Sequence, residues 1–299
     1  PNGSVLFLIE NCDATLNNVS VSSSSVNATN NLFGGTIYIQ TAKSKGVITD
    51  LIDNQITSAR NVSGGLIYNR RTLNPVGELN LNGDVNKNQI TAKVNVSGGI
   101  LNNEKSSIQS IDWNEVKNNT ITTTDGSVTG GFIQNKLGKI DNLHIGSFSG
   151  NTINSNLKVV DGGILYNESG TVNGELKIGQ IVGNTIKAKT NLNGLITNVT
   201  GNINSISIDS VSNNNFEMNF LRGGVINLQG AKVNDITIGE INNNNIKGSE
   251  KSTSTGFVLY LKEAPEDSKV SSSIGNLTVG KVSGNTINAT NITSLLFIS

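Results

Sequence analysis

Apolar residues along the chain fall into three short patterns that return about every thirty residues. The first pattern opens with a glycine doublet and continues with an apolar run, as in GGLIYN at 64–69 and GGILYN at 162–167. Asn193-Gly194 and Thr255-Gly256 occupy two further places in the same series. Self-similarity with this period indicates stacked structural repeats, so 299 residues need not mean two globular domains.

The other two patterns predict strands. One alternates apolar and polar residues, as in Leu143-His144-Ile145, and a period of two is typical of a strand with one buried face. The other places an asparagine two positions before a large apolar residue, as in Asn151 and Ile153. Since this asparagine returns in every repeat, we expect a stack of amides that stabilises the array by hydrogen bonding. The stack comprises Asn54, Asn88, Asn119, Asn151, Asn184, Asn214, Asn244 and Asn285.

Helices are not expected, because no stretch keeps apolar residues at helical spacing and β-branched residues occupy the periodic positions. We predict an all-β protein, a parallel β-helix (β-solenoid) of about eight to nine coils, each with roughly thirty residues and three strands. Residues 1–299 should form a single solenoid domain. A strand spacing of about 4.8 Å gives this domain a length of roughly 40 Å.

The repeat is interrupted once and is in the same phase at both ends. Residues 261–273 contain Pro265 and several charged residues, and we expect an inserted loop there. Residues 4–9 and 294–298 both resemble the strand that follows a glycine doublet. Both ends therefore look like open repeat strands, which predicts a fragment of a longer array or a subunit that stacks head to tail.

Polar residues inside the alternating pattern should point outward and form one column. Its members are Asn80, Asp112, His144, Lys177, Ser207, Thr237 and Thr278. An acid/base pair of Asp112 and His144 is conceivable. Opposite charges on neighbouring exposed strands more often decorate a sheet, where they contribute at most about 1 kcal/mol. Trp113 aligns with Ile145 and Ile178, which predicts that it fills the interior.

The composition limits which partners, metal sites and reactions are expected of the chain. The 22 basic residues balance 22 acidic ones without a run of either sign, so no nucleic acid is expected as a partner. Cys12 and His144 are the only cysteine and histidine, and one residue of each kind cannot supply the ligands of a zinc cluster. No metal, cofactor or catalytic residue is predicted. No apolar run approaches the roughly 18 residues that a membrane span needs, so no membrane insertion by this segment is expected.

The repeat unit as a whole, GGILYN followed by LKIGQIVGNTIKAKTN, resembles the repeats of bacterial autotransporter passenger domains and related adhesins. The resemblance implies a right-handed parallel β-helix, secreted or held at the bacterial outer surface, that acts in adhesion, self-association, filament or biofilm formation. Expected partners are a receptor or glycan on a host or neighbouring cell. Further copies of the chain are also expected, bound through the terminal strands or the long face. On this view the protein is not an enzyme.

A polysaccharide-acting enzyme, either a lyase or a hydrolase, is the alternative, because β-helices also carry such sites. Its only candidate residues are Asp112, His144, Lys177 and Asp141.

Overall fold

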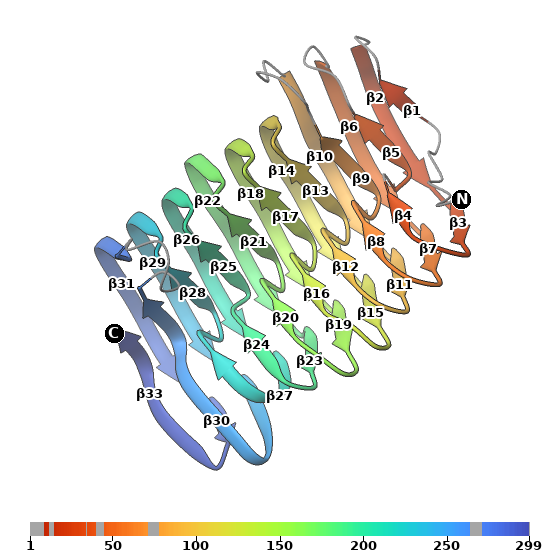
Figure 1. The fold of residues 1–299 in the computed structure, drawn as a ribbon. Coiled ribbons are helices and arrows are strands. Elements are labelled where there is room, and N and C mark those ends of the chain that lie inside the picture. The colour runs from red at the N-terminus through yellow and green to blue at the C-terminus, as the bar shows by residue number, and fades with distance from the viewer. Residues whose placement is uncertain are drawn as a thin grey trace.

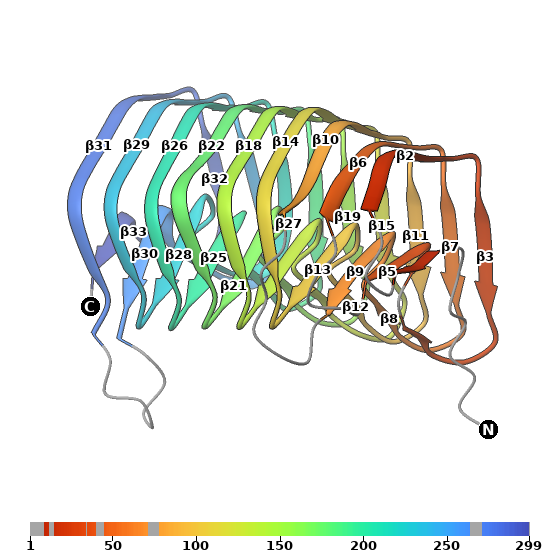
Figure 2. The ribbon, with the colours of Figure 1, turned by 90° about the horizontal axis from the view of Figure 1, so that it is seen from above.

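A computed structural model describes residues 9–11, 15–33, 35–39, 45–70, 78–263 and 271–298 of the chain. Strands are the only regular elements in these ranges, and their pairings are parallel. The strands form one nine-stranded sheet and one 24-stranded sheet. The chain winds through both sheets once per coil, and the coils lie side by side as a β-solenoid (Figures 1 and 2).

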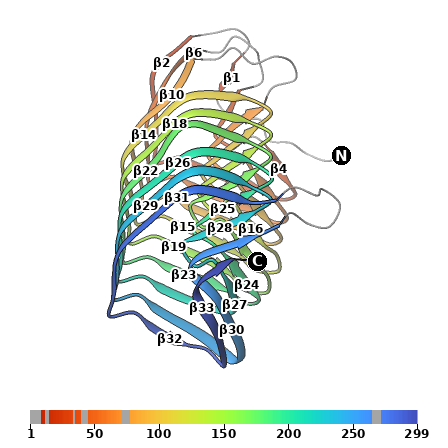
Figure 3. The same cartoon turned by 90° about the vertical axis from the view of Figure 1, so that its left-hand side faces the viewer.

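The nine-stranded sheet contributes one long strand to each coil, and these strands gather on one side of the solenoid (Figure 3). In order they are β2 (Thr15–Ser22), β6 (Lys45–Ile52), β10 (Glu78–Asn86), β14 (Ser107–Lys117), β18 (Lys139–Ser149), β22 (Thr171–Val182), β26 (Asn202–Ser212), β29 (Lys232–Asn242) and β31 (Ser273–Ser283). The solenoid makes about seven turns, so the prediction of eight to nine coils is slightly too high. Seven of the nine, from β6 to β29, have a neighbouring strand on both sides.

The 24-stranded sheet supplies three short segments per coil. The first segments are β3 (Ser25–Ala28), β7 (Gln55–Ser58), β11 (Gln89–Ala92), β15 (Thr120–Thr123), β19 (Thr152–Ser155), β23 (Thr185–Ala188), β27 (Asn215–Arg222), β30 (Asn245–Lys262) and β32 (Thr286–Asn288). The second are β4 (Leu32–Phe33), β8 (Val62–Ser63), β12 (Val96–Ser97), β16 (Val128–Thr129), β20 (Val160–Asp161) and β24 (Asn191–Asn193). The third are β1 (Ile9–Asn11), β5 (Ile37–Ile39), β9 (Ile67–Arg70), β13 (Leu101–Glu104), β17 (Ile133–Lys136), β21 (Leu165–Glu168), β25 (Ile196–Val199), β28 (Ile226–Gln229) and β33 (Asn291–Ile298).

Most coils therefore hold four strands where the sequence pattern predicted three. The additional strand is the short segment before the glycine doublets, and it was missed because in β8, β12 and β16 only one of its two residues is apolar. That residue points inward: Val62, Val96 and Val128 stack in register and are fully buried. One apolar position is too short a signal for a period to be recognised.

The core is a continuous column of apolar side chains enclosed by the coils. Along β18, Leu143, Ile145 and Phe148 are buried, and polar residues alternate with them on the outside. Trp113 is completely buried, as predicted, and stands in register with Ile145. On its other side it pairs with Gly83, where a Cβ would approach Asp50 Oδ1 and not the indole ring.

The predicted asparagine stack is present and buried in seven of its eight members, from Asn54 to Asn244. Each side-chain Nδ2 donates to the Oδ1 of the next asparagine at 2.9–3.1 Å, and the main-chain N–H donates to the same oxygen at 2.9–3.0 Å. The second Nδ2 hydrogen goes to a carbonyl of the preceding coil at 2.7–3.0 Å. We call this array the first ladder.

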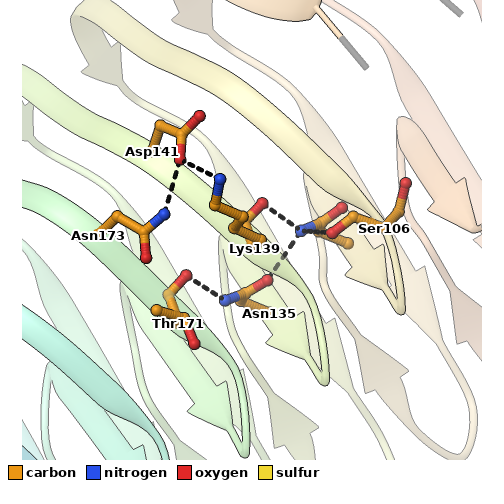
Figure 4. A network of polar contacts seen from close by, with 7 residues as sticks. Ser106, Asn135, Lys139, Asp141, Thr171 and Asn173 are labelled. Carbon is orange, nitrogen blue, oxygen red and sulfur yellow. Dashed lines mark hydrogen bonds and ion pairs between the residues drawn. The ribbon is translucent and has the colours of Figure 1, made fainter. Parts of the chain in front are cut away.

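A second ladder, which the sequence pattern did not reveal, lies inside the strands that follow the glycine doublets. It consists of Asn69, Asn103, Asn135, Asn167 and Asn198, all fully buried. In each of the four consecutive pairs, the Nδ2 donates to the Oδ1 of the next asparagine at 2.7–2.9 Å. Figure 4 shows Asn135 with its dashed contact to Thr171 of the next coil. The ladder ends where Ile39 and Leu228 take the equivalent places in the outer coils.

Glycine doublets turn the chain sharply between the second and third segments. The first glycine of the doublet adopts a positive φ, as Gly98 does at 63°, a conformation that costs little only for glycine. The second glycine lies against the next coil, and a Cβ on Gly99 would approach the carbonyl oxygen of Gly131 to 2.3 Å. The repeated doublet is thus explained by the turn and by the close stacking of coils.

The predicted inserted loop at 261–273 and the two ends of the chain lie partly within the described residues. β30 extends to Lys262, and Leu261 and Lys262 pair with Leu228 and Gln229, so the segment between strands spans 263–272. Residues 264–270, like residues 1–8 at the start, lie outside the described residues. Ile9 pairs with Ile37 and Leu296 pairs with Leu259, so β1 and β33 share the phase of the strand after the doublet.

Replacing Asn151 with alanine should destabilise the protein strongly. The substitution leaves the Asn119 amide and main-chain N–H without their acceptor and removes the donor to the Val116 carbonyl. Several buried groups that lose a partner correspond to about 3–5 kcal/mol of unfolding free energy. Denaturant unfolding followed by circular dichroism measures this change.

Asn173→Ala is the matched control, because exposed Asn173 makes only a surface contact with Asp141. Its effect should stay within about 0.5 kcal/mol. Equal effects of the two substitutions would contradict a special role for the first ladder.

Candidate functional site

The outer column of the nine-stranded sheet contains the residues considered for acid/base chemistry. Asp112 stands opposite His144, which stands opposite Lys177 in the next coil. His144 Nδ1 lies 2.8 Å from Asp112 Oδ1. Their side chains are 47% and 60% exposed, so water surrounds much of the pair.

One predicted member of this column is wrong. Asn82, rather than Asn80, pairs with Asp112, and Asn80 pairs with Ser110. The alternating pattern misled the alignment because Gly83, opposite Trp113, takes the place that an apolar residue holds in other coils. Leu81 pairs with Ile111 and so holds the first apolar position of the pattern in this coil.

Asp141 does not join the grouping. It lies 2.9 Å from the Lys139 ammonium and accepts a hydrogen bond from Asn173 at 2.8 Å (Figure 4). It is three positions before His144 on the same strand, a separation of about 10 Å. The structure thus brings Asp112 and His144 into contact, places Lys177 beside His144, and keeps Asp141 apart.

In the described ranges no three His, Cys, Asp or Glu side chains come together as a metal site, and Cys12 lies outside these ranges. No helix long and apolar enough to span a membrane occurs there.

A second surface follows the glycine doublets along the solenoid, and we call it the glycine-corner groove. One wall consists of the outward residues just before the doublets: Phe33, Ser63, Ser97, Thr129, Asp161, Asn193, Arg222 and Thr255. The other wall consists of outward residues just after them: Tyr38, Tyr68, Asn102, Gln134, Tyr166, Thr197, Asn227, Tyr260 and Phe297. Residues of both walls line one depression of about 310 Å³ in the first coils.

The groove exists because the doublet folds the two walls toward each other. A Cβ on Gly98 would lie 2.7 Å from the Asn102 Cβ, and a Cβ on Gly130 would lie 2.7 Å from the Gln134 Cβ. Side chains of the second wall therefore rest directly on the glycines. Tyr68, Asn102 and Gln134 are at most 6% exposed although they point away from the core.

All four tyrosines of the chain stand in the second wall. The rings of Tyr38 and Tyr68 are 5.5 Å apart, and Tyr260 stacks on Phe297 at 4.9 Å. The sequence carried a signal for this column, because GGTIYI, GGLIYN, GGILYN and TGFVLY place tyrosine at nearly the same step after the glycines. Our sequence analysis did not recognise it.

Tyr68 and Tyr166 of this wall are held in their neutral form. The Tyr68 hydroxyl donates to Glu104 Oε2, and burial together with this carboxylate raises the pKa of Tyr68 far above its ordinary value. Arg70 Nε lies 3.9 Å from the same Glu104 oxygen. Burial, Glu168 and Asp161 raise the pKa of Tyr166. Tyr68 therefore acts as an uncharged hydrogen-bond donor, and Tyr166 is uncharged as well.

The fold defines the chain as a parallel β-solenoid protein. No family model matches the chain, and neither a curated protein nor a solved structure matches it.

Replacing Asp161 with asparagine should stabilise the protein near neutral pH. Burial raises the pKa of Asp161, while the hydrogen bond from Asn193 and the charge of Arg222 lower it by less. Because the folded pKa lies above the unfolded one, ionisation of Asp161 costs stability at neutral pH. This cost disappears as the pH falls below the ordinary carboxyl range.

Thermal unfolding of Asp161→Asn and wild type should therefore differ at neutral pH and converge in acid. Asp141→Asn, which removes the surface contact with Lys139, is the control and should not be stabilising. A destabilised Asp161→Asn variant at neutral pH would refute the assignment.

Proposed function

We propose that the chain is a noncatalytic structural and adhesive protein of the extracellular space or bacterial outer surface. It attaches cells to a surface or to each other, as the likeness of its repeat to autotransporter passenger domains implies. The observation that carries the proposal is the pair of asparagine ladders, which join successive coils into one continuous rod. The nine strands of the long sheet, at a spacing of about 4.8 Å, span roughly 40 Å along the rod.

The character of the long face supports attachment through many weak contacts. Ser207, Thr237 and Thr278 stack in register on the nine-stranded sheet, and hydroxyl groups both donate and accept hydrogen bonds. The chain has no net charge at pH 7, so neutral polar contacts rather than charge attraction would provide the binding energy. Copies of the chain can associate through the same face, and association through the terminal strands stays a prediction.

Beads coated with the purified chain should adhere to cultured cells or clump with one another. Beads coated with heat-unfolded chain are the control, because unfolding destroys the regular face but keeps the composition. Counting attached and clumped beads measures the effect. If folded and unfolded coatings behave alike, the adhesive proposal is wrong.

A polysaccharide-acting enzyme is the second candidate. The specific observation in its favour is the contact between Asp112 and His144, which borders a depression of about 390 Å³ together with Asn82 and Asn142. An acid/base pair of this kind could transfer a proton to a glycosidic oxygen.

The His144→Ala variant distinguishes the adhesive protein from the polysaccharide-acting enzyme. On the adhesive proposal, the variant should adhere like wild type and lose at most about 1 kcal/mol of stability, since it breaks an exposed pair. Release of reducing sugars from a polysaccharide panel by wild type but not by His144→Ala would establish the enzyme instead.

A further inference from the structure

We propose that the first coils of the glycine-corner groove bind an uncharged glycan. The inference rests on the proposed adhesive function and names the site and the class of ligand. The site is the depression of about 310 Å³ that Phe33, Ser63, Ser97, Tyr68, Arg70, Asn102, Glu104, Gln134 and Lys136 line.

Phe33 provides an open apolar surface at one end of the depression. It is 43% exposed, although a phenyl ring normally avoids water. The next residues of the same wall are small, Ser63 and Ser97, so space remains beside the ring. A site lined by aromatic side chains with a few polar groups is typical of small-ligand recognition, and sugar rings offer C–H faces that pack on such a ring.

Asn102 provides the polar counterpart on the other wall. Its side chain is 5% exposed, and its Oδ1 accepts no hydrogen bond from the protein. This oxygen is closed off from solvent, so a ligand hydroxyl can donate to it only after the Asn102 side chain turns toward the depression. The hydrogen bond then formed would recover the cost of about 1–3 kcal/mol that a buried acceptor without a partner carries. Gln134, in register with Asn102, adds a second amide that can both donate and accept, as sugar hydroxyls do.

Charges at the rim of the depression already have partners. Glu104 accepts from the Tyr68 hydroxyl and lies close to Arg70. Lys136 Nζ lies 3.1 Å from Glu168 Oε2. Because each of these charged side chains is paired with an opposite charge of the protein, the site favours an uncharged ligand over a sulfated or carboxylated one.

The length of the groove fits an extended polymer. From Phe33 to Gln134 it crosses four coils, or three intervals of about 4.8 Å, which is roughly 14 Å. One coil is comparable in length to one hexose unit, so successive sugars can meet successive coils. A single sugar would use only part of the site, so the ligand should be an oligosaccharide.

Binding of cellohexaose, maltohexaose and chitohexaose to the immobilised intact chain tests the proposal. At least one of the three should bind wild type, and Phe33→Ala should weaken it about tenfold, as expected for the loss of an aromatic contact. Ser97→Trp, which fills the depression from the first wall, should abolish binding. Circular dichroism verifies that the variants are folded.

Phe220→Ala is the matched control, because Phe220 is 42% exposed but belongs to neither wall of the groove. It should bind like wild type. If none of the three sugars binds, the proposed binding site is wrong. It is also wrong if a sugar binds and both Phe33→Ala and Ser97→Trp leave this binding unchanged. If the chain binds heparin in a salt-sensitive way and binds none of the three uncharged sugars, the proposal that the ligand is an uncharged glycan is wrong.

The bead assay, run in parallel, distinguishes this inference from the proposed function. Beads that adhere although no hexasaccharide binds leave the adhesive function standing and reject the site. Sugar binding that depends on Phe33 without any adhesion supports the site and rejects the adhesive function.

Discussion

Hydrogen bonding between stacked asparagine amides is the constraint on which the rest of the structure depends. A buried amide has two donor hydrogens and an acceptor oxygen that must all be satisfied, and in the first ladder the neighbouring coils supply every partner. This is possible only if the coils stack in parallel and in register. The residue before each ladder asparagine must also adopt a positive φ, as Asn118 and Asn213 do at 55°, which explains the frequent Asn-Asn and Gly-Asn pairs.

The same regular stacking determines what the surface can be. Since every coil repeats the path of the previous one, outward side chains form columns, and the turn at the glycine doublets brings two of these columns together as a groove. Features that could give specificity arise where single coils depart from the repeat. Phe33 is such a departure at the start of a column of small residues, and Trp113 opposite Gly83 is another inside the core.

The two asparagine ladders and the glycine-corner groove use their asparagine side chains differently. Asn135 in the second ladder is completely buried, its amide is hydrogen-bonded, and it offers no contact to a partner. Asn69, at the end of the same ladder, is buried as well, but its Oδ1 accepts no hydrogen bond. Asn102, one position before the ladder residue Asn103, faces the groove and keeps an unpaired oxygen. Adjacent asparagines of one strand thus divide between the buried ladder and the groove, because successive residues of a strand point to opposite faces.

The sequence by itself determined the repeat, the parallel β-solenoid, the first ladder and the burial of Trp113, because each depends on local periodicity that recurs in every coil. Only the tertiary structure decided which asparagines after the doublets are buried, since an asparagine at a strand end usually indicates a turn. It also decided the register at Asn82, the separation of Asp141 from His144, and the groove. These depend on how coils lie against one another, and no periodicity within one repeat contains that information.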